Sequence, residues 1–265
     1  MESLSGGQKI IVEYHRPQTL AEAVELLQRP QPLTRPLGGG TALDFKSDRP
    51  LAVVDLQSLS LNAIERQGNL LQVGATVTLQ ELLEFPDLPP ALGDAIRHQA
   101  TYNLRHQATV GGSLVSADGR SPFGVAMLAL DAQLTLIPGE RVLSYGDFLA
   151  LREENVSGNL ITRIQFNLQV ELAYQAVART PADLPIVCAA LARWPSGRLR
   201  LALGGWGKTP TFVLDGQGHE GLRLAAESAF SAAEDEWASA TYRSQIAGVL
   251  AKRCWQQIAS KQKEG

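Results

Sequence analysis

Two glycine stretches constrain this chain more than any other part of its sequence. They read Gly38-Gly39-Gly40-Thr41 and Thr109-Val110-Gly111-Gly112-Ser113. Consecutive glycines let a backbone approach a ligand closely and direct several N–H groups at one point, which suits a phosphate. Neither stretch is a Walker loop, because no Gly-Lys-Ser/Thr follows, and neither has the G-x-G-x-x-G spacing of a dinucleotide fold. Taken alone, each stretch is equally compatible with an ordinary turn.

Charge and cysteine content argue against several classes of protein. A net charge of −3 and a pI of 5.9, with no basic cluster longer than Lys252-Arg253, argue against a nucleic-acid binder. Cys188 and Cys254 are too few and too far apart for an iron–sulfur or zinc site, and the histidines lack metal-ligand spacing. We therefore expect no bound metal. Apolar neighbours predict buried, reduced thiols, although the sequence leaves a disulfide between them open.

The hydropathy of the chain predicts a soluble, cytoplasmic protein that contacts no membrane. The first residues form no apolar signal segment, and no run of 18 apolar residues occurs. At 265 residues and 45% hydrophobic content, the chain can form one large domain or two to three smaller ones.

The first part of the chain mixes helix and strand patterns. Thr19 with Glu22 and Thr78 with Glu81 are capping boxes that predict helix starts, the first helix running through Leu27. Apolar spacing predicts further helices over 91–102 and 125–130. Strands are expected at 9–12, 51–56, 70–75 and 133–137. Three prolines at 30, 32 and 36 predict an extended path into the first glycine stretch.

The pattern changes near 160–170. From Leu160 onward, apolar and polar residues alternate as in an antiparallel sheet. A hairpin is predicted from 186–193 and 199–203 with a turn at Pro195-Ser196-Gly197. Two closing helices are expected over 220–236 and 242–261. These changes suggest a domain boundary near 160–170 and another near 58–68.

Several short sequence motifs, taken in order along the chain, resemble those of one family. In the first half these are residues 38–43, Val53-Val54-Asp55-Leu56, Val73-Gly74-Ala75-Thr76, Asn103-Leu104-Arg105, residues 108–114 and Leu128-Ala129-Leu130-Asp131-Ala132. In the second half they are residues 201–205, Thr209-Pro210 and Tyr242-Arg243. Together they resemble the FAD-binding (medium) subunit of molybdenum hydroxylases, of the xanthine dehydrogenase and carbon monoxide dehydrogenase type. The resemblance covers nearly the whole chain.

This resemblance implies an α+β fold. It would comprise a two-subdomain, PCMH-like FAD-binding domain and a C-terminal α+β domain with antiparallel sheet and helices. The implied division is 1–60 and 61–165 for the two FAD-binding subdomains and 166–265 for the C-terminal domain. The boundaries suggested by the pattern agree with this division.

The resemblance also implies a set of cofactor-binding residues. The first glycine stretch would give backbone N–H groups to the FAD pyrophosphate, and the second would lie beside the flavin. The implied residues are Leu37, Gly38, Gly39, Gly40, Thr41, Ala42, Leu43, Thr109, Gly111, Gly112, Ser113, Ser116 and Asp118. No residue is assigned a catalytic acid, base or nucleophile role, because the redox chemistry belongs to the flavin.

Three positions depart from the family pattern. Relatives commonly carry Asn where Ser113 stands and an acidic residue where this chain has Ser121-Pro122. Asp118 is a candidate replacement for that carboxylate. Many relatives have lysine or another polar residue after the aromatic at Tyr174, where this chain has Gln175.

Other polar and aromatic residues have a plain structural interpretation beside a functional one. Asp55 fits a carboxylate at a strand end as well as a ligand contact. Arg105 and His106 fit a solvated loop, and Tyr102 fits the core at a helix end. The four tryptophans are expected to pack rather than stack on a cofactor.

The implied function is an electron-transfer subunit. Its FAD would relay electrons from an iron–sulfur subunit, supplied by a large molybdopterin-binding subunit, to NAD or another acceptor. One alternative is a stand-alone flavin reductase of peptidoglycan precursor synthesis, which shares the flavin fold. Another is a non-catalytic scaffold subunit that has lost flavin binding, an idea motivated by Ser113 and Pro122.

Overall fold

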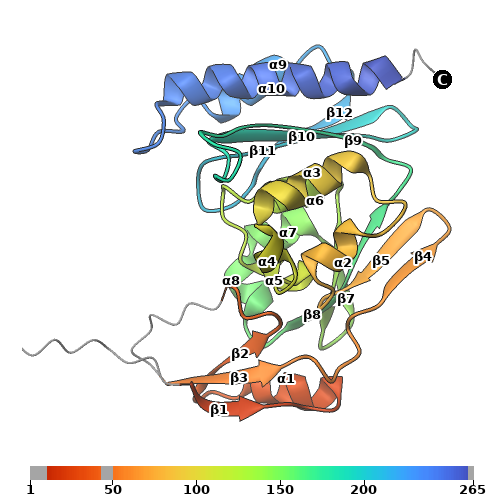
Figure 1. The fold of residues 1–265 in the computed structure, drawn as a ribbon, viewed down its shortest axis with the longest axis vertical. Helices are drawn as coiled ribbons and strands as arrows, with labels where there is room; N and C mark the ends of the chain where they lie inside the picture. The colour runs from red at the N-terminus through yellow and green to blue at the C-terminus, as the bar shows by residue number, and fades with distance from the viewer. Residues whose placement is uncertain (1–10, 43–49, 262–265) are drawn as a thin grey trace, which may run out of the picture.

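A computed structural model describes residues 11–42 and 50–261 of the chain (Figure 1). It contains three sheets, and each draws its strands from one continuous part of the sequence. The fold mixes helices with separate sheets, which confirms the predicted α+β class. No helix in the described parts is long and apolar enough to cross a membrane.

The first sheet is small and parallel. Its strand order is β1 (Ile11–His15), β3 (Leu51–Asp55) and β2 (Leu33–Leu37), and α1 (Leu20–Gln28) packs on one face. Thr19 caps α1 by accepting a hydrogen bond from the Glu22 N–H at 3.2 Å, as its capping-box pattern predicts. The predicted strand over 9–12 differs from β1, because β1 continues to His15. Residues 9 and 10 lie outside the described residues.

The second sheet has five antiparallel strands. Their order is β4 (Ile64–Gln67), β5 (Leu70–Gly74), β8 (Leu160–Asn167), β6 (Gln133–Ile137) and β7 (Arg141–Ser144). Antiparallel pairing therefore begins at β4, well before the expected change near 160. The short exposed strands β4 and β7 carry weak apolar alternation, so the sequence did not predict them.

Helices of the middle segment pack against this second sheet and against one another. They are α2 (Leu79–Leu83), α3 (Pro90–Gln99), α4 (Tyr102–Arg105), α5 (Val110–Val115), α6 (Pro122–Ala129), α7 (Tyr145–Ala150) and α8 (Arg152–Val156). The core here is built from apolar side chains of α2, α3, α5, α6 and the inner strands. The predicted capping box at Thr78 and Glu81 is present at α2.

Two helices in this segment have bounds that differ from the predicted ones. The helix expected over 91–102 ends at Gln99, because Ala100 is extended and its carbonyl accepts a hydrogen bond from Arg105 at 2.9 Å. The helix expected over 125–130 starts earlier, at Pro122. Ser121 caps it by accepting from the Gly124 N–H at 3.1 Å, and proline at the first helical position needs no N–H partner.

The third sheet is antiparallel, in the order β12 (Thr211–Gln217), β11 (Arg198–Gly204), β10 (Val187–Arg193) and β9 (Glu171–Val177). α9 (Leu222–Ala229) and α10 (Ala240–Lys261) cover one face, and α3 and α6 lie against the other (Figure 1). Strand β10 is apolar on every position up to Ala192 because both of its faces are buried. The predicted hairpin and closing helix 242–261 are confirmed.

The helix predicted over 220–236 is too long. Helix α9 ends at Ala229, and the chain then forms a loop to α10. Arg243, which is fully buried, donates hydrogen bonds to the carbonyls of Ala233 and Ala238 and to the Asp235 carboxylate. These long-range bonds stabilise an irregular path that local helix propensity does not encode.

Cys188 and Cys254 are both buried and free, as the apolar context predicts. Cys188 belongs to the core between the third sheet and α6, and Cys254 to the core beneath α10. Burial raises the pKa of the Cys188 thiol to about 12.

Candidate functional site

The two glycine stretches, which are distant in sequence, lie directly against each other. A Cβ atom added at Gly39 would lie 1.5 Å from the carbonyl oxygen of Gln107, and one at Gly38 would lie 2.8 Å from Thr109 Oγ1. No real Cβ contact is that short, so both positions require glycine for packing alone. The two stretches thus form one continuous backbone surface.

The first stretch follows the end of β2. The last residue of that strand, Leu37, accepts a hydrogen bond from the Leu56 N–H at 3.1 Å, which fixes the start of the stretch against β3. Gly40 has a φ of +72°, a conformation that favours glycine. Within the described residues, no backbone hydrogen bond uses the N–H groups of residues 38–41. These adjacent donors are available to an anionic ligand.

The second stretch has a different structure from the first. It is not a turn: residues 110–115 form helix α5, capped by Thr109, whose Oγ1 accepts from the Gly112 N–H at 3.2 Å. The N–H groups of Val110, Gly111 and Ser113 donate to backbone carbonyls. Because the N–H groups of residues 110–113 are already bonded, this stretch can contact a ligand by packing against it but not by donating these hydrogen bonds.

Gly111 and Gly112 have different surroundings. A Cβ atom on Gly111 would lie 2.9 Å from Ala75 on the neighbouring backbone, so the helix packs tightly there. Gly112 is exposed, and a Cβ atom would meet only Thr109 Oγ1 within 4 Å. The open side of α5 is therefore at Gly112.

Polar side chains after α5 are bonded locally. Ser116 Oγ donates to the Gly112 carbonyl at 2.8 Å, and Asp118 Oδ1 accepts from the Arg120 N–H at 2.8 Å. Ser113 is half-buried at the middle of α5. The exposed Asp118 carboxylate keeps its second oxygen free of any hydrogen bond recorded in the described residues.

The loop that contains Asp118 is fixed to the third sheet. The Gly119 N–H donates to the Gly207 carbonyl at 3.0 Å, and the Gly205 N–H donates to the Gly119 carbonyl at 2.7 Å. Arg120 donates to the carbonyls of Leu184 and Pro185 and stacks on Trp237, 4.8 Å from the ring centroid. Three loops at one end of the C-terminal segment therefore meet the loop that follows the second glycine stretch (Figure 1).

The three departures from the family pattern have distinct positions. Pro122 begins α6, so a helix start occupies the place where relatives carry an acid. Gln175 donates to Gln257 on α10 at 3.0 Å, and therefore lies on the face of the third sheet away from α6. Ser113 alone of the three belongs to the glycine stretches.

The other residues with two possible interpretations have different environments in the structure. Asp55 is buried and accepts from the Tyr14 hydroxyl and from the Gln57 N–H, as expected of a strand-end carboxylate. Arg105 donates to Gln80 at 3.0 Å. The expectation that Tyr102 belongs to the core is wrong, because its side chain is 61% exposed and contacts His106 edge to face.

The four tryptophans differ in how far they are buried. Trp194, Trp206 and Trp255 are partly buried and pack against the apolar cores, as predicted. Trp237 is 41% exposed, and the guanidinium groups of Arg120 and Arg179 each lie 4.8 Å from its ring centroid. A tryptophan in an irregular loop gives no periodic signal, so the sequence did not indicate this arrangement.

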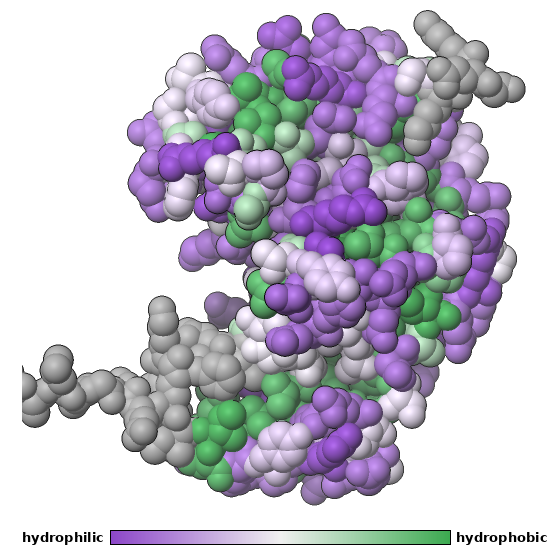
Figure 2. Space-filling view, in the orientation of Figure 1, coloured by the Kyte–Doolittle hydropathy of each residue, from purple (hydrophilic) through white to green (hydrophobic). Residues whose placement is uncertain are grey.

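The molecular surface is indented beside these elements. Figure 2 shows a hollow on the left, between the lower part that contains the first sheet and the middle part of the molecule. The glycine stretches join these two parts, since Gly38 and Gly39 follow β2 while residues 107–109 precede α5. Leu37, Gly38–Gly40, Thr41 and Ala42 lie at this junction, whereas Leu43 lies outside the described residues.

Comparison with known proteins gives consistent results across sequence and structure. Residues 9–167 match the family model described as the FAD binding domain in molybdopterin dehydrogenase. The protein YgfM of Escherichia coli K12 is 30% identical over 248 residues, covering 91% of this chain and 94% of that protein. The carbon monoxide dehydrogenase medium chain of Afipia carboxidovorans is 26% identical, covering 95% of this chain and 98% of that protein.

The fold also matches solved structures. Quinoline 2-oxidoreductase from Pseudomonas putida 86 aligns with a TM-score of 0.79 over 96% of this chain and 99% of that chain, at 24% identity. The carbon monoxide dehydrogenase of Hydrogenophaga pseudoflava aligns with a TM-score of 0.78 over 94% and 97%, at 22% identity. At these identities the likeness establishes the fold.

The residues present fit FAD. A pyrophosphate needs several convergent donors, and the N–H groups of residues 38–41 are adjacent donors that use no backbone partner among the described residues. Thr109 Oγ1 lies 2.8 Å from a Cβ atom added at either Gly38 or the exposed Gly112, so this side of α5 is near the first stretch.

Proposed function

This chain belongs to the family of FAD-binding domains of molybdopterin dehydrogenases, and we propose that it is the flavoprotein subunit of a multi-subunit molybdenum hydroxylase. In this role the subunit relays electrons from an iron–sulfur subunit to NAD or another acceptor. The relatives named as medium chains, such as that of carbon monoxide dehydrogenase, support an assembly with further subunits. The three sheets, each from one part of the sequence, support a division near residues 60 and 165.

The unpartnered N–H groups of the first glycine stretch carry this proposal. Residues 38–41 bind the pyrophosphate of FAD through these donors, and Leu37, Ala42 and Leu43 line the same place. Thr109, Gly111, Gly112 and Ser113 form the surface that adjoins the flavin ring. Ser116 and Asp118, at the end of α5, face the part of the cofactor between the two.

The chain's own residues position and shield the cofactor. Bound FAD supplies the electron-transfer chemistry, because its ring both accepts and donates electrons. The loop at 116–121, fixed by Gly119 to the third sheet, limits solvent access from the side of the C-terminal segment. No acid or base is required of the protein for this relay.

The visible spectrum of the purified full-length chain tests the proposal. We expect absorbance bands of oxidised flavin, and FAD identified by mass after heat release. Co-purification with iron–sulfur and molybdopterin subunits tests the assembly, and reduction of NAD by the complex tests the acceptor. A colourless chain that joins such partners yet takes up no added FAD would favour the scaffold alternative.

The stand-alone reductase makes a different prediction. Steady NADPH oxidation by the isolated chain in the presence of an enolpyruvyl substrate would support that alternative. We expect no such turnover, since the likeness to medium chains extends over the C-terminal part of this chain as well.

A further inference from the structure

One glutamine of α3 is hydrogen-bonded to the start of α6. Gln99 is the last residue of α3, and it is half-buried. Its side-chain oxygen Oε1 accepts from the Ser121 hydroxyl at 2.7 Å and from the Phe123 N–H at 3.2 Å. Because a backbone N–H can only donate, the contact with Phe123 requires that the oxygen of this amide, and not its nitrogen, faces α6. Both acceptor positions of that oxygen are therefore used.

Ser121 connects Gln99 to the loop before α6 and to α6 itself. Its hydroxyl donates to Gln99 and accepts from the Gly124 N–H at 3.1 Å, and its own N–H donates to the Asp118 carbonyl at 3.2 Å. Ser121 is 2% exposed and Phe123 is fully buried, so water has no access to these donors unless the chain moves. The start of α6 is thus fixed from α3.

The loop at 116–121 is held on two sides. On one side, Gly119 bonds the loop to the third sheet through the Gly207 carbonyl. On the other side, Gln99 bonds it to α3. Every residue of α6 is buried, and the helix packs against α3 and against strands β10 and β11, so α6 has little room to shift. Loss of either support should therefore displace the loop rather than the helix.

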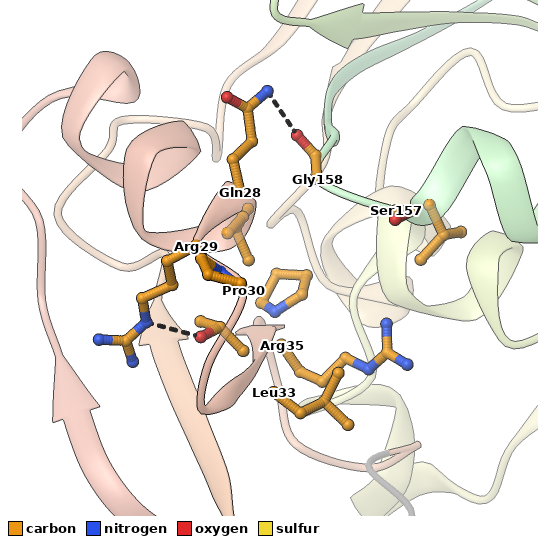
Figure 3. Close-up of a pocket in the computed structure, with 11 residues that line it drawn as sticks. Gln28, Arg29, Pro30, Leu33, Arg35, Ser157 and Gly158 are labelled. Atoms are coloured by element: carbon orange, nitrogen blue, oxygen red, sulfur yellow. Dashed lines mark hydrogen bonds between the residues drawn. The ribbon is translucent and has the colours of Figure 1, made fainter.

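A second glutamine joins separate segments in a different way. Gln28, at the end of α1, donates to the Gly158 carbonyl at 3.3 Å beside a cavity of about 620 Å³ (Figure 3). Gln28 is exposed, so solvent can satisfy that carbonyl when the side chain is removed. The side-chain oxygen of Gln99 has no such substitute, because the donors that it accepts from are buried.

We propose that Gln99 is a positioning residue for FAD, which acts through Ser121 by fixing the loop that carries Ser116 and Asp118. The assignment rests on the proposed function, in which these two side chains face the cofactor. Without the Gln99 oxygen, the Phe123 N–H and the Ser121 hydroxyl are buried donors that lack an acceptor. The loop must open to satisfy them, and Asp118, whose carbonyl is bonded to Ser121, moves with it.

Two substitutions at Gln99 separate the role of the acceptor from that of side-chain volume. Gln99→Leu has a similar volume and no acceptor. Gln99→Glu keeps an oxygen at the same distance from the backbone, where the N-terminus of α6 favours a negative charge. Binding of FAD to the flavin-free full chain is measured by quenching of flavin fluorescence. We expect Gln99→Leu to weaken binding by about tenfold or more and Gln99→Glu to weaken it by less than about threefold.

The control substitution is Gln257→Leu on α10. Gln257 is also half-buried, and its side-chain oxygen accepts from Gln175 at 3.0 Å on the face of the third sheet away from α6. We expect this variant to bind FAD as wild type does. Gln99→Asn is a second, milder variant, because its side chain is one methylene shorter and cannot accept both bonds. It should weaken FAD binding by an intermediate amount, and thermal melting checks that each variant folds.

Visible circular dichroism of the bound flavin distinguishes positioning from a purely structural role. The signal depends on the asymmetric surroundings of the ring, so a displaced loop changes the spectrum even at saturating FAD. We expect Gln99→Leu and Gln99→Asn to alter this spectrum and Gln99→Glu to retain that of wild type.

The outcomes separate the two proposals. Gln99→Leu and Gln99→Asn that melt earlier yet bind FAD with wild-type affinity and spectrum would overturn the assignment, because Gln99 would then contribute to stability alone. Gln99→Glu that binds as poorly as Gln99→Leu would overturn it too, since the acceptor would not be the group that matters. Both results leave the proposed function intact. A wild-type chain that takes up no FAD would overturn the proposed function and this inference with it.

Discussion

The α-carbon of Gly39 faces the carbonyl oxygen of Gln107 so closely that a Cβ atom would lie 1.5 Å from that oxygen. This contact joins the loop after β2 to the segment before α5, and so brings the two glycine stretches together. Backbone packed against backbone leaves no flexible side chain that could yield.

We therefore predict that Gly39→Ala separates the two stretches. The added methyl group overlaps a main-chain atom, so one segment must shift, and FAD binding should weaken by about tenfold or more. Flavin fluorescence titration measures the loss. Gly221→Ala is the control, because its Cβ atom meets nothing within 4 Å and its φ is ordinary. Wild-type affinity in Gly39→Ala would show that the contact does not shape the site.

Arg243 should be required for stability. It is fully buried and bonds Ala233, Ala238, Asp235 and the Ile186 carbonyl, so it joins the loop before α10 to the start of β10. Removal of a buried charge partner and its hydrogen bonds costs about 3–5 kcal/mol. We expect Arg243→Met to lower the free energy of unfolding in urea by about that amount.

The control for Arg243 lies on the same helix. Arg253 is exposed on α10, and Arg253→Ala should change the free energy of unfolding by less than about 0.5 kcal/mol. Similar losses in both variants would mean that α10 tolerates no arginine substitution and that the buried bonds have no special weight.

The ion pairs of Asp215 with β11 should respond to acid. Arg198 and Arg200 on β11 each contact both Asp131, which follows α6, and Asp215 on β12. The hydrogen bond from Arg198 lowers the pKa of Asp215 below its ordinary value of 3.8. Its stabilising effect is therefore complete above pH 3.8 and decreases as the pH falls through the lower, folded-state pKa.

Urea unfolding at several pH values measures this effect. We expect Asp215→Asn to be less stable than wild type near neutral pH and the difference to shrink below pH 3.8. Asp94→Asn, whose carboxylate pairs with Arg97 on the surface of α3, is the control. A difference between wild type and Asp215→Asn that stays constant down to pH 3 contradicts the assignment.

Arg120 should order the loop between β9 and β10. Its guanidinium donates to Leu184 at 2.8 Å and to Pro185 at 3.3 Å, and it stacks on Trp237. Without these bonds, we expect backbone amides of residues 178–186 to exchange hydrogen roughly tenfold faster in Arg120→Ala. Arg179→Ala, which also loses a contact with the Trp237 ring, should have a smaller effect because Arg179 makes a single 3.5 Å hydrogen bond among the described residues. Equal exchange in wild type and Arg120→Ala would exclude this role.

Much of the secondary structure could be predicted because its signals are local. The Thr19 and Thr78 capping boxes act within one helical turn, and the all-apolar β10 reflects burial on both faces. The bounds of α9 could not be predicted, because Arg243 stabilises the following loop from a later part of the chain. Likewise, Tyr102 follows a buried helix in sequence, yet the break at Ala100 directs it to the surface.

The sequence by itself determined which residues form the candidate site, since consecutive glycines are recognisable without coordinates. Only the tertiary structure decided how the two stretches differ. The N–H groups of residues 110–113 donate to the neighbouring segment at 75–77 and to Thr109, whereas residues 38–41 follow an edge strand and keep theirs free of backbone partners in the described chain. The physical reason is that a glycine pattern specifies where a backbone can go, while the partners of each N–H depend on segments that fold against it.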